Sequence, residues 1–239
     1  MRRLIIILVC VLPMVSVTAM AQSDGPARWT LMYHVGRTSF DMKEVKDLMA
    51  EAISFYNSAG VQIGKQIDFP FNYLNGAELT RTGGTLRLGI GYAGSNSMAF
   101  GAYRDEAGLV RLKAEVSATM VYALCGLEDE ISFMPGISAH LTGKVGSLSG
   151  RVVTEETVSF IDYHDIAVDR DLTSDARAFY VQVAGGLQTH LFGPIVAGLE
   201  AGYRSGRIGE LQLWSAGKKA NVNVSGWEFS VTVGGRVLW

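Results

Sequence analysis

The sequence is poor in cysteine, in net charge and in long apolar runs, and each shortage excludes a class of protein. Cys10 and Cys125 are its only cysteines, so neither a disulfide framework nor a cysteine-ligated zinc cluster can form. Lysine and arginine number 21 against 23 acidic residues, without the basic excess of a nucleic-acid-binding protein. After residue 21 no run of 18 apolar residues occurs, which excludes an ordinary membrane-spanning helix.

The first 21 residues have the layout of a secretory signal peptide. Arg2 and Arg3 supply the positive start, Leu4 to Val17 the apolar run, and Ala19-Met20-Ala21 a small-x-small cleavage site. A single membrane anchor is the alternative, but the apolar run is short for a spanning helix. We therefore expect residues 1–21 to be removed on export, with no cofactor and no nucleic acid bound by the rest.

Alternation of apolar and polar residues dominates the remaining chain. The stretch from Trp227 to Trp239, W-E-F-S-V-T-V-G-G-R-V-L-W, is apolar at its odd positions except for Gly235. Because successive side chains of a strand point to opposite faces, such a strand has one apolar and one polar face. The same pattern predicts strands over residues 29–36, 61–75, 85–93, 110–124, 131–145, 177–190, 195–204 and 227–239.

One segment, residues 39–58, has a helical period instead. Met42, Val45, Met49 and Ile53 fall on one face, and charged residues fall on the other. We expect this amphipathic helix to fold over the mouth of the structure and bury its apolar face. A lid or docking surface for a hydrophobic ligand or partner is the alternative.

Evenly spread alternating strands predict an all-β fold: a transmembrane antiparallel up-and-down β-barrel formed by residues 22–239, with the helix as an insertion. Eight strands are expected, and ten would follow if residues 97–104 and 151–164 were additional spans. With the chain end on the periplasmic side, the four long connections fall outside the cell, as such barrels prefer. These connections are residues 38–60, 94–108, 146–175 and 206–221.

A soluble barrel of the lipocalin kind shows the same alternation with its apolar face turned inward. The signal peptide, the aromatic residue Trp239 at the end, and the many glycines favour the membrane barrel. The polar face would then line the lumen, where charges must pair because an eight-stranded barrel is just wide enough for side chains to fill. The expected lumen network comprises Arg87, Arg111, Lys113, Glu115, His140, Lys144, Glu200, Arg204, Glu228 and Arg236.

From Leu109 onward the order of segments resembles the generic Gram-negative outer-membrane protein β-barrel domain. The resemblance covers about 130 residues and is carried by L-K-A-E-V-S-A-T-M-V-Y, I-S-F-M-P-G-I-S-A-H, V-A-G-G-L-Q-T-H, L-E-A-G-Y-R and S-G-W-E-F-S-V-T-V-G. It implies location in the cell outer membrane, contact with outer-membrane lipids, and insertion by the barrel-assembly machinery, with Trp239 as the assembly signal.

The four histidines are the candidates for enzymatic residues. The lipid A deacylase barrels carry a histidine two residues before a serine, whereas His140 is followed by Leu141-Thr142 and His164 by Asp165-Ile166. His34 and His190 are expected to fill the lumen. The acidic connection 146–175 lacks the spacing of an EF-hand loop. No catalytic, cofactor-binding or metal-binding residue is therefore predicted.

The sequence thus predicts a monomeric outer-membrane barrel with a structural or interaction role, whose partner would be an extracellular ligand or protein bound through its loops. A narrow channel or a carrier for small or hydrophobic molecules is the second hypothesis. A lipid-modifying barrel enzyme is the third.

Overall fold

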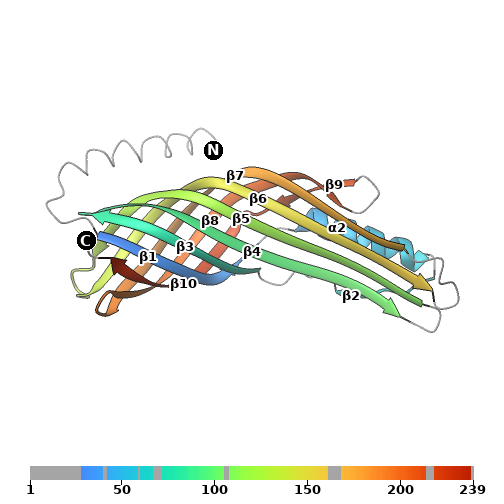
Figure 1. Ribbon diagram of the computed structural model, residues 1–239, viewed down its shortest axis with the longest axis horizontal. Coiled ribbons are helices and arrows are strands. Elements are labelled where there is room, and N and C mark those ends of the chain that lie inside the picture. The colour runs from blue at the N-terminus through green and yellow to red at the C-terminus, as the bar shows by residue number, and fades with distance from the viewer. Residues whose placement is uncertain are drawn as a thin grey trace.

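The computed structural model describes residues 28–39, 42–58, 60–66, 72–104, 108–160, 168–213 and 218–237 (Figure 1). Its elements are β1 (Arg28–Thr38), α2 (Lys43–Ser58), β2 (Gly64–Gln66), β3 (Asn72–Gly83), β4 (Leu86–Arg104), β5 (Gly108–Glu130), β6 (Ile137–Phe160), β7 (Val168–Phe192), β8 (Ile195–Leu213), β9 (Lys218–Asn223) and β10 (Gly226–Val237). The predicted signal peptide and Trp239 lie outside the described residues. In the described part of the chain, no helix is both long and apolar enough to cross a bilayer.

Eight of these strands close into a ring. The order is β1-β3-β4-β5-β6-β7-β8-β10, and β10 pairs with β1 to complete the circle. All neighbours are antiparallel and consecutive along the chain apart from short β2 and β9. The predicted eight-stranded up-and-down barrel with one helix is confirmed. The segments 97–104 and 151–160 are the outer ends of β4 and β6, so they add no further spans.

The strand register fixes the tilt of the barrel. A path that starts at Trp227 and follows the paired residues once around the ring ends at Val237, ten positions further along the same strand; it passes Tyr203, Val183, Gly143, Cys125, Leu88, Arg81 and Trp29. A shift of this size in an eight-stranded barrel corresponds to a strand tilt of about 40°. The ten positions from Trp227 to Val237 then rise about 25 Å, which is the height of the apolar band on membrane barrels.

The outer wall of the ring is apolar over this height. Exposed aliphatic side chains cover it, among them Leu31, Val35, Ile90, Val121, Leu141, Leu187, Leu199 and Val231. Exposed aromatic side chains gather near one height at the rim toward the helix, namely Tyr73, Tyr92, Phe179, Tyr203 and Trp227. The wall therefore has the apolar band and aromatic girdle that suit contact with hydrocarbon and its interface.

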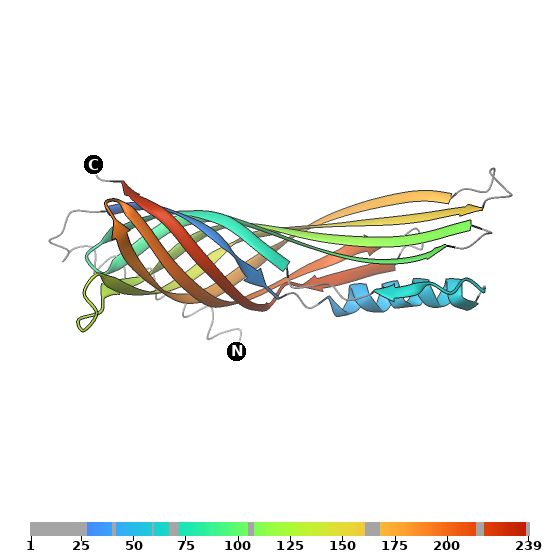
Figure 2. The same cartoon turned by 90° about the horizontal axis from the view of Figure 1, so that it is seen from below.

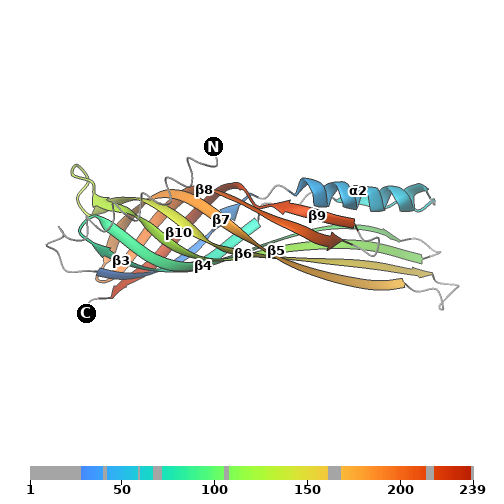
Figure 3. The same cartoon turned by 90° about the horizontal axis from the view of Figure 1, so that it is seen from above.

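Five strands, β4 to β8, continue well past this rim. Figures 2 and 3 show them running away from the ring as a long extension, with α2 and β9 beside them. β9 pairs with the outer end of β8, and β2 pairs with the outer end of β4. The extension includes most of the segment 146–175, which was predicted to be a loop; that prediction was wrong, because paired strands β6 and β7 occupy it up to Phe160 and from Val168.

A hydrophobic core fills the space between the extension and the helix. Its side chains come from α2, from β5 and β6, and from β8 and β9, and they are at most 1 % exposed. Examples are Val45, Met49, Ile53, Leu112, Val116, Val152, Ile208, Leu211 and Val222. The predicted burial of the apolar face of the helix is confirmed, but the helix lies beside the extension and not over the mouth of the ring (Figure 3). The extension therefore has the interior of a water-soluble protein, with apolar residues inside and polar residues outside.

Two predicted strand boundaries also differ from the structure. β3 begins at Asn72 and continues to Gly83, so residues 76–83 form part of a strand where a connection was expected. At the opposite end, β5 runs to Glu130 and β6 starts only at Ile137, which leaves Phe133 in a turn. That turn closes at Gly136, whose φ of 82° is a left-handed conformation that favours glycine.

Polar contacts hold α2 in place at both ends. The Glu44 carboxylate accepts hydrogen bonds from the backbone N–H (2.7 Å) and the side-chain amide (2.9 Å) of Asn221 in β9. Toward the other end, the Tyr56 hydroxyl donates a hydrogen bond to Glu156 of β6. Burial and then this contact with Glu156 raise the pKa of Tyr56 above its ordinary value.

The contact of Glu44 predicts an acid-sensitive helix start. The Asn221 backbone N–H lowers the pKa of Glu44 below its usual value of 4.5. The stabilisation is thus present above that value and is lost as pH falls through the lower pKa of the folded state. Hydrogen exchange of the first turn of α2, corrected for the intrinsic pH dependence, should accelerate about twofold to fivefold between about pH 6 and pH 3. The Glu44→Gln variant should lack this acid dependence.

Candidate functional site

The centre of the barrel lumen holds a lysine between two carboxylates. Lys144 on β6 donates hydrogen bonds to Glu78 Oε1 at 2.5 Å and to Glu200 Oε1 at 2.6 Å. The three side chains come from β6, β3 and β8 and are at most 2 % exposed. Because an unpaired charge at such a depth would be strongly penalised, each of the three depends on the others.

Two histidines and a tyrosine complete this central group. His34 Nε2 lies 3.4 Å from Glu78 Oε2, and His140 Nε2 lies 3.2 Å from Glu200 Oε2. The Tyr122 hydroxyl donates to Glu78 Oε1 at 2.8 Å, and the Lys144 ammonium lies 5.3 Å from the centre of the same tyrosine ring. The central group thus spans the lumen from β1 and β3 to β5, β6 and β8.

A second group lies toward the end of the barrel that carries the short turns. Arg87 Nη1 lies 3.5 Å from Glu128 Oε2 and 3.5 Å from the side-chain oxygen of Gln188. Gln188 donates to the other oxygen of Glu128. Arg87 Nη2 also lies 3.7 Å from Glu78 Oε2, which links this group to the central one.

A third group, around Arg204, lies toward the extension. The guanidinium is fully buried; Nε donates to the backbone carbonyl of Val224 at 2.8 Å, and Nη1 lies 3.4 Å from Glu228 Oε2. Nη2 donates to the hydroxyl of Thr38. On the side of Arg204 that faces the extension, the lumen is continuous with the hydrophobic core of the extension, where Met120 and Tyr180 are buried.

The charges of the three groups nearly balance. Three cations, Arg87, Lys144 and Arg204, face four carboxylates, Glu78, Glu128, Glu200 and Glu228. Three possible metal ligands of the described residues, from His34, Glu78 and Glu200, lie within 4.8 Å of one another. The Lys144 ammonium already contacts both carboxylates of that set, so it supplies the cation there. The arrangement suits charge compensation and filling of the lumen.

The structure places the predicted lumen residues on two different faces. Arg87, His140, Lys144, Glu200, Arg204 and Glu228 lie buried in the lumen, and Arg236 lies half-buried on the inward side of β10 near its end. Three others are corrected, because Arg111, Lys113 and Glu115 point away from the interior in the outer part of β5. Lys113 pairs there with Glu155 at 2.6 Å, and this hydrogen bond raises the pKa of Lys113.

The reason for this correction is the position of β5 relative to the rim. Its even-numbered residues from Val110 to Leu124 were predicted to face lipid, yet all are buried. In the outer half of β5 the apolar residues face inward and pack in the core that they share with the helix. Nearer the turn between β5 and β6, the exposed apolar side chains are those at odd positions, such as Val121 and Leu127.

Sequence reasoning missed Glu78, Glu128 and Tyr122 as lumen residues. Glu78 was missed because residues 76–84 were assigned to a connection between two strands. The alternation of Glu78, Thr80 and Thr82 with outward residues was the signal that could have revealed a strand. Tyr122 was missed because it shares the phase of β5 that was assigned to lipid.

The three histidines that the structure describes show no arrangement for nucleophilic catalysis. His34 and His140 face carboxylates inside the lumen, and His190 is exposed near the end of β7. His164 lies outside the described residues. Both lumen histidines therefore belong to the ion network.

Comparisons with known proteins found solved structures of similar fold but no related sequence. No family model matches the sequence. No curated protein sequence matches it significantly either. Solved structures that resemble the fold include Ail, the attachment invasion locus protein of Yersinia pestis, in complex with the heparin analogue sucrose octasulfate (12 % identity, TM-score 0.38, 88 % of this chain and 97 % of that one).

Two further structures resemble the chain to a similar degree. Neisserial surface protein A is 11 % identical with a TM-score of 0.36 over 90 % of this chain and 100 % of that one. The N-terminal β-barrel domain of Pseudomonas aeruginosa OprF is 10 % identical with a TM-score of 0.32, over 87 % and 97 %.

Proposed function

We propose that this chain is an outer-membrane β-barrel protein with a structural or interaction role, exerted through the extension outside the membrane. The observation that carries the proposal is the reversal of the apolar face along β5. Val121 and Leu127 face outward in the ring, whereas Leu112 and Val116 face inward in the extension. An apolar outer wall suits hydrocarbon and an apolar interior suits water, so the strand leaves a bilayer and enters solvent along its length.

The extension, rather than the lumen, offers a surface to a partner. The lumen is filled by the ion network and then by the apolar core. The outer face of the extension carries a row of cross-strand ion pairs, including Lys113 with Glu155 (2.6 Å) and Arg151 with Asp175 (2.8 Å). The packed core behind this polar face keeps its strands together as one sheet. This favours a role in which the face binds a partner, and not one in which the barrel conducts.

The orientation of the barrel can be tested with cysteine labelling of intact cells. In a Cys125→Ser background, Lys113→Cys places a thiol on the extension and Ser132→Cys places one in the turn after β5. A membrane-impermeant maleimide should label the first thiol in intact cells and the second only after permeabilisation. Labelling of Ser132→Cys alone would show that the extension faces the periplasm, and equal labelling of both would contradict a membrane-spanning barrel.

The interaction role competes with the narrow-channel hypothesis, and planar-bilayer recording separates the two. A filled lumen predicts no conductance steps above the leak. If steps occur, the channel hypothesis replaces the present one. Retention of intact cells on immobilised extracellular proteins and polysaccharides tests the interaction directly. A Lys113→Glu, Arg151→Glu double variant should lose retention while it remains in the membrane, and unchanged retention would exclude this face.

A further inference from the structure

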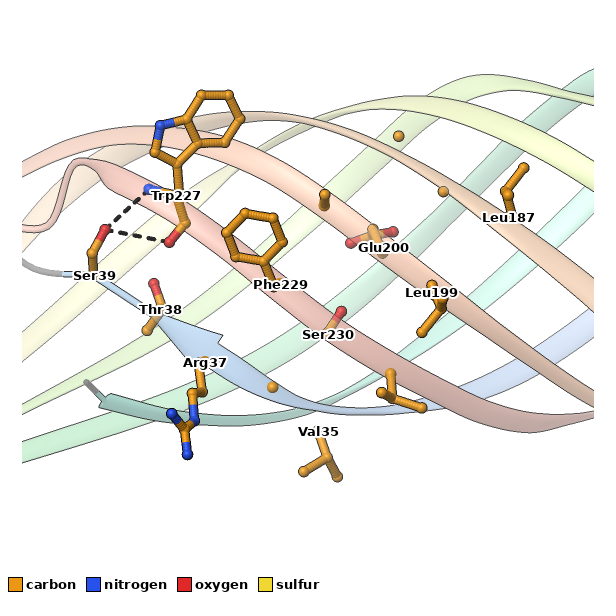
Figure 4. Close-up of a pocket in the computed structure, with 15 residues that line it drawn as sticks. Val35, Arg37, Thr38, Ser39, Leu187, Leu199, Glu200, Trp227, Phe229 and Ser230 are labelled. Atoms are coloured by element: carbon orange, nitrogen blue, oxygen red, sulfur yellow. Dashed lines mark hydrogen bonds between the residues drawn. The ribbon is translucent and has the colours of Figure 1, made fainter.

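The outer wall of the ring is hollowed by an apolar groove of about 700 Å³. It crosses β1, β10, β8 and β7, close to the aromatic rim, and Figure 4 shows the side chains that line it. The groove lies on the outside of the barrel, because its aliphatic lining residues are about half exposed. Its outward-facing lining residues take no part in the ion network, although Thr38 and Glu200, which also border it, contact that network from the lumen side.

Small residues create the depression. Gly185 pairs with Ala201, which in turn pairs with Phe229, so this row has little side-chain volume on β7 and β8. A Cβ added to Gly185 would meet only ordinary van der Waals contacts, 3.5 Å or more away, which shows open space on that side. The next row, Leu187-Leu199-Val231-Val35, forms one wall of the groove, and Trp227 stands on the other side.

The groove is inclined toward the middle of the band. The row that runs through it starts at Arg37, which pairs with Phe229, and ends at Gly185 three strands away. Since a row of paired residues descends as it passes from β1 through β10 and β8 to β7, Gly185 lies roughly 10 Å deeper than Arg37. The shallow end is at the aromatic rim, and the deep end is within the apolar band.

A cation stands at the shallow end. Arg37 is exposed, and its guanidinium lies 5.9 Å from the centre of the Tyr73 ring. Glu200 is the other charged residue that lines the groove, but its carboxylate faces the lumen, where it contacts Lys144 and His140. The charge that the groove presents outward is therefore positive.

We infer that the groove seats one acyl chain of an anionic, phosphate-bearing membrane lipid, with the Arg37 guanidinium holding the phosphate. An amphiphile of this kind has its charge at the interface and its chain directed inward, which matches the cation at the rim and the inclined apolar floor. The inference rests on the proposed membrane placement of the barrel. It assigns one lipid to a specific binding site, the lipid seat, in contrast to the lipids that surround the rest of the wall.

Quenching of Trp227 by brominated lipids tests the seat. A chain with Trp29→Phe, Trp214→Phe and Trp239→Phe keeps Trp227 as its single tryptophan and retains an aromatic residue at its end. It would be folded into vesicles that contain chain-brominated phosphatidylglycerol, which is anionic, or chain-brominated phosphatidylcholine, which is zwitterionic. The apparent affinity at Trp227 should favour the anionic lipid about fivefold, as expected for one cation at the surface.

Two variants and a matched control complete the test. Arg37→Gln should reduce the preference to about one, and Gly185→Leu should weaken quenching by both lipids because its side chain fills the floor. Arg81→Gln is the control, since Arg81 is an exposed cation near the opposite end of the barrel, beside position 29; it should leave the preference intact. Quenching without preference, or a preference that survives Arg37→Gln, would overturn the lipid seat alone. Absence of quenching by either lipid would instead contradict the membrane placement.

Discussion

Replacement of Lys144 by methionine is expected to lower the free energy of unfolding by about 3–5 kcal/mol. The substitution removes the ammonium from between Glu78 and Glu200, which leaves Glu200 buried without a lysine or arginine partner and Glu78 with only Arg87 Nη2 at 3.7 Å. Methionine fills a similar volume, so the loss would come from charge and not from a cavity. Urea unfolding of the chain in phospholipid vesicles, followed by tryptophan fluorescence, measures the change.

Lys113 provides a matched control for this experiment. Its Nζ also lies 2.6 Å from a carboxylate, that of Glu155, but on the outer face of the extension where solvent screens the pair. Lys113→Met should therefore cost less than about 1 kcal/mol. Neutralisation of both partners in a Lys144→Met, Glu78→Gln, Glu200→Gln triple variant should recover most of the stability. Equal losses at positions 144 and 113 would refute the view that burial makes the central lysine indispensable.

Truncation of Leu112 to alanine is expected to destabilise the extension by about 3 kcal/mol while the ring stays folded. Leu112 is fully buried in the core that α2 shares with β5. A loss of this size raises the population of the locally opened extension about a hundredfold, which hydrogen exchange of α2 would report. Migration of the folded barrel in electrophoresis without heating should remain unchanged.

The neighbouring residue tests the orientation of the strand. Arg111 occupies the opposite, exposed face of β5, so Arg111→Ala should change exchange of α2 by less than about threefold. If Arg111→Ala had the larger effect, the even positions of outer β5 would face outward as the sequence pattern first indicated. Leu112→Ala and Arg111→Ala together thus show whether the even or the odd positions of outer β5 face inward.

Prediction from the sequence succeeded where local pattern and physical rule agree. Alternation specified antiparallel strands, and the helical period specified α2, because both depend on residues a few positions apart. Lys144, Glu200, Arg204 and Glu228 were assigned to the lumen because their strands lie within the band, where polar residues avoid lipid. Partners such as Glu78 and Glu128 were missed, since each was assigned to a connection rather than a strand.

The sequence by itself determined that the chain forms a closed antiparallel barrel with one amphipathic helix. It could not determine which face of a strand points inward, because alternation has the same period whichever side is apolar. Only the tertiary structure decided this, by setting where each strand leaves the ring. Within the ring, apolar residues such as Val121 face out; beyond it, residues such as Leu112 face in, because α2 and β9 cover them. The physical reason is that the sign of amphipathicity depends on the surroundings of the wall, which the sequence pattern does not specify.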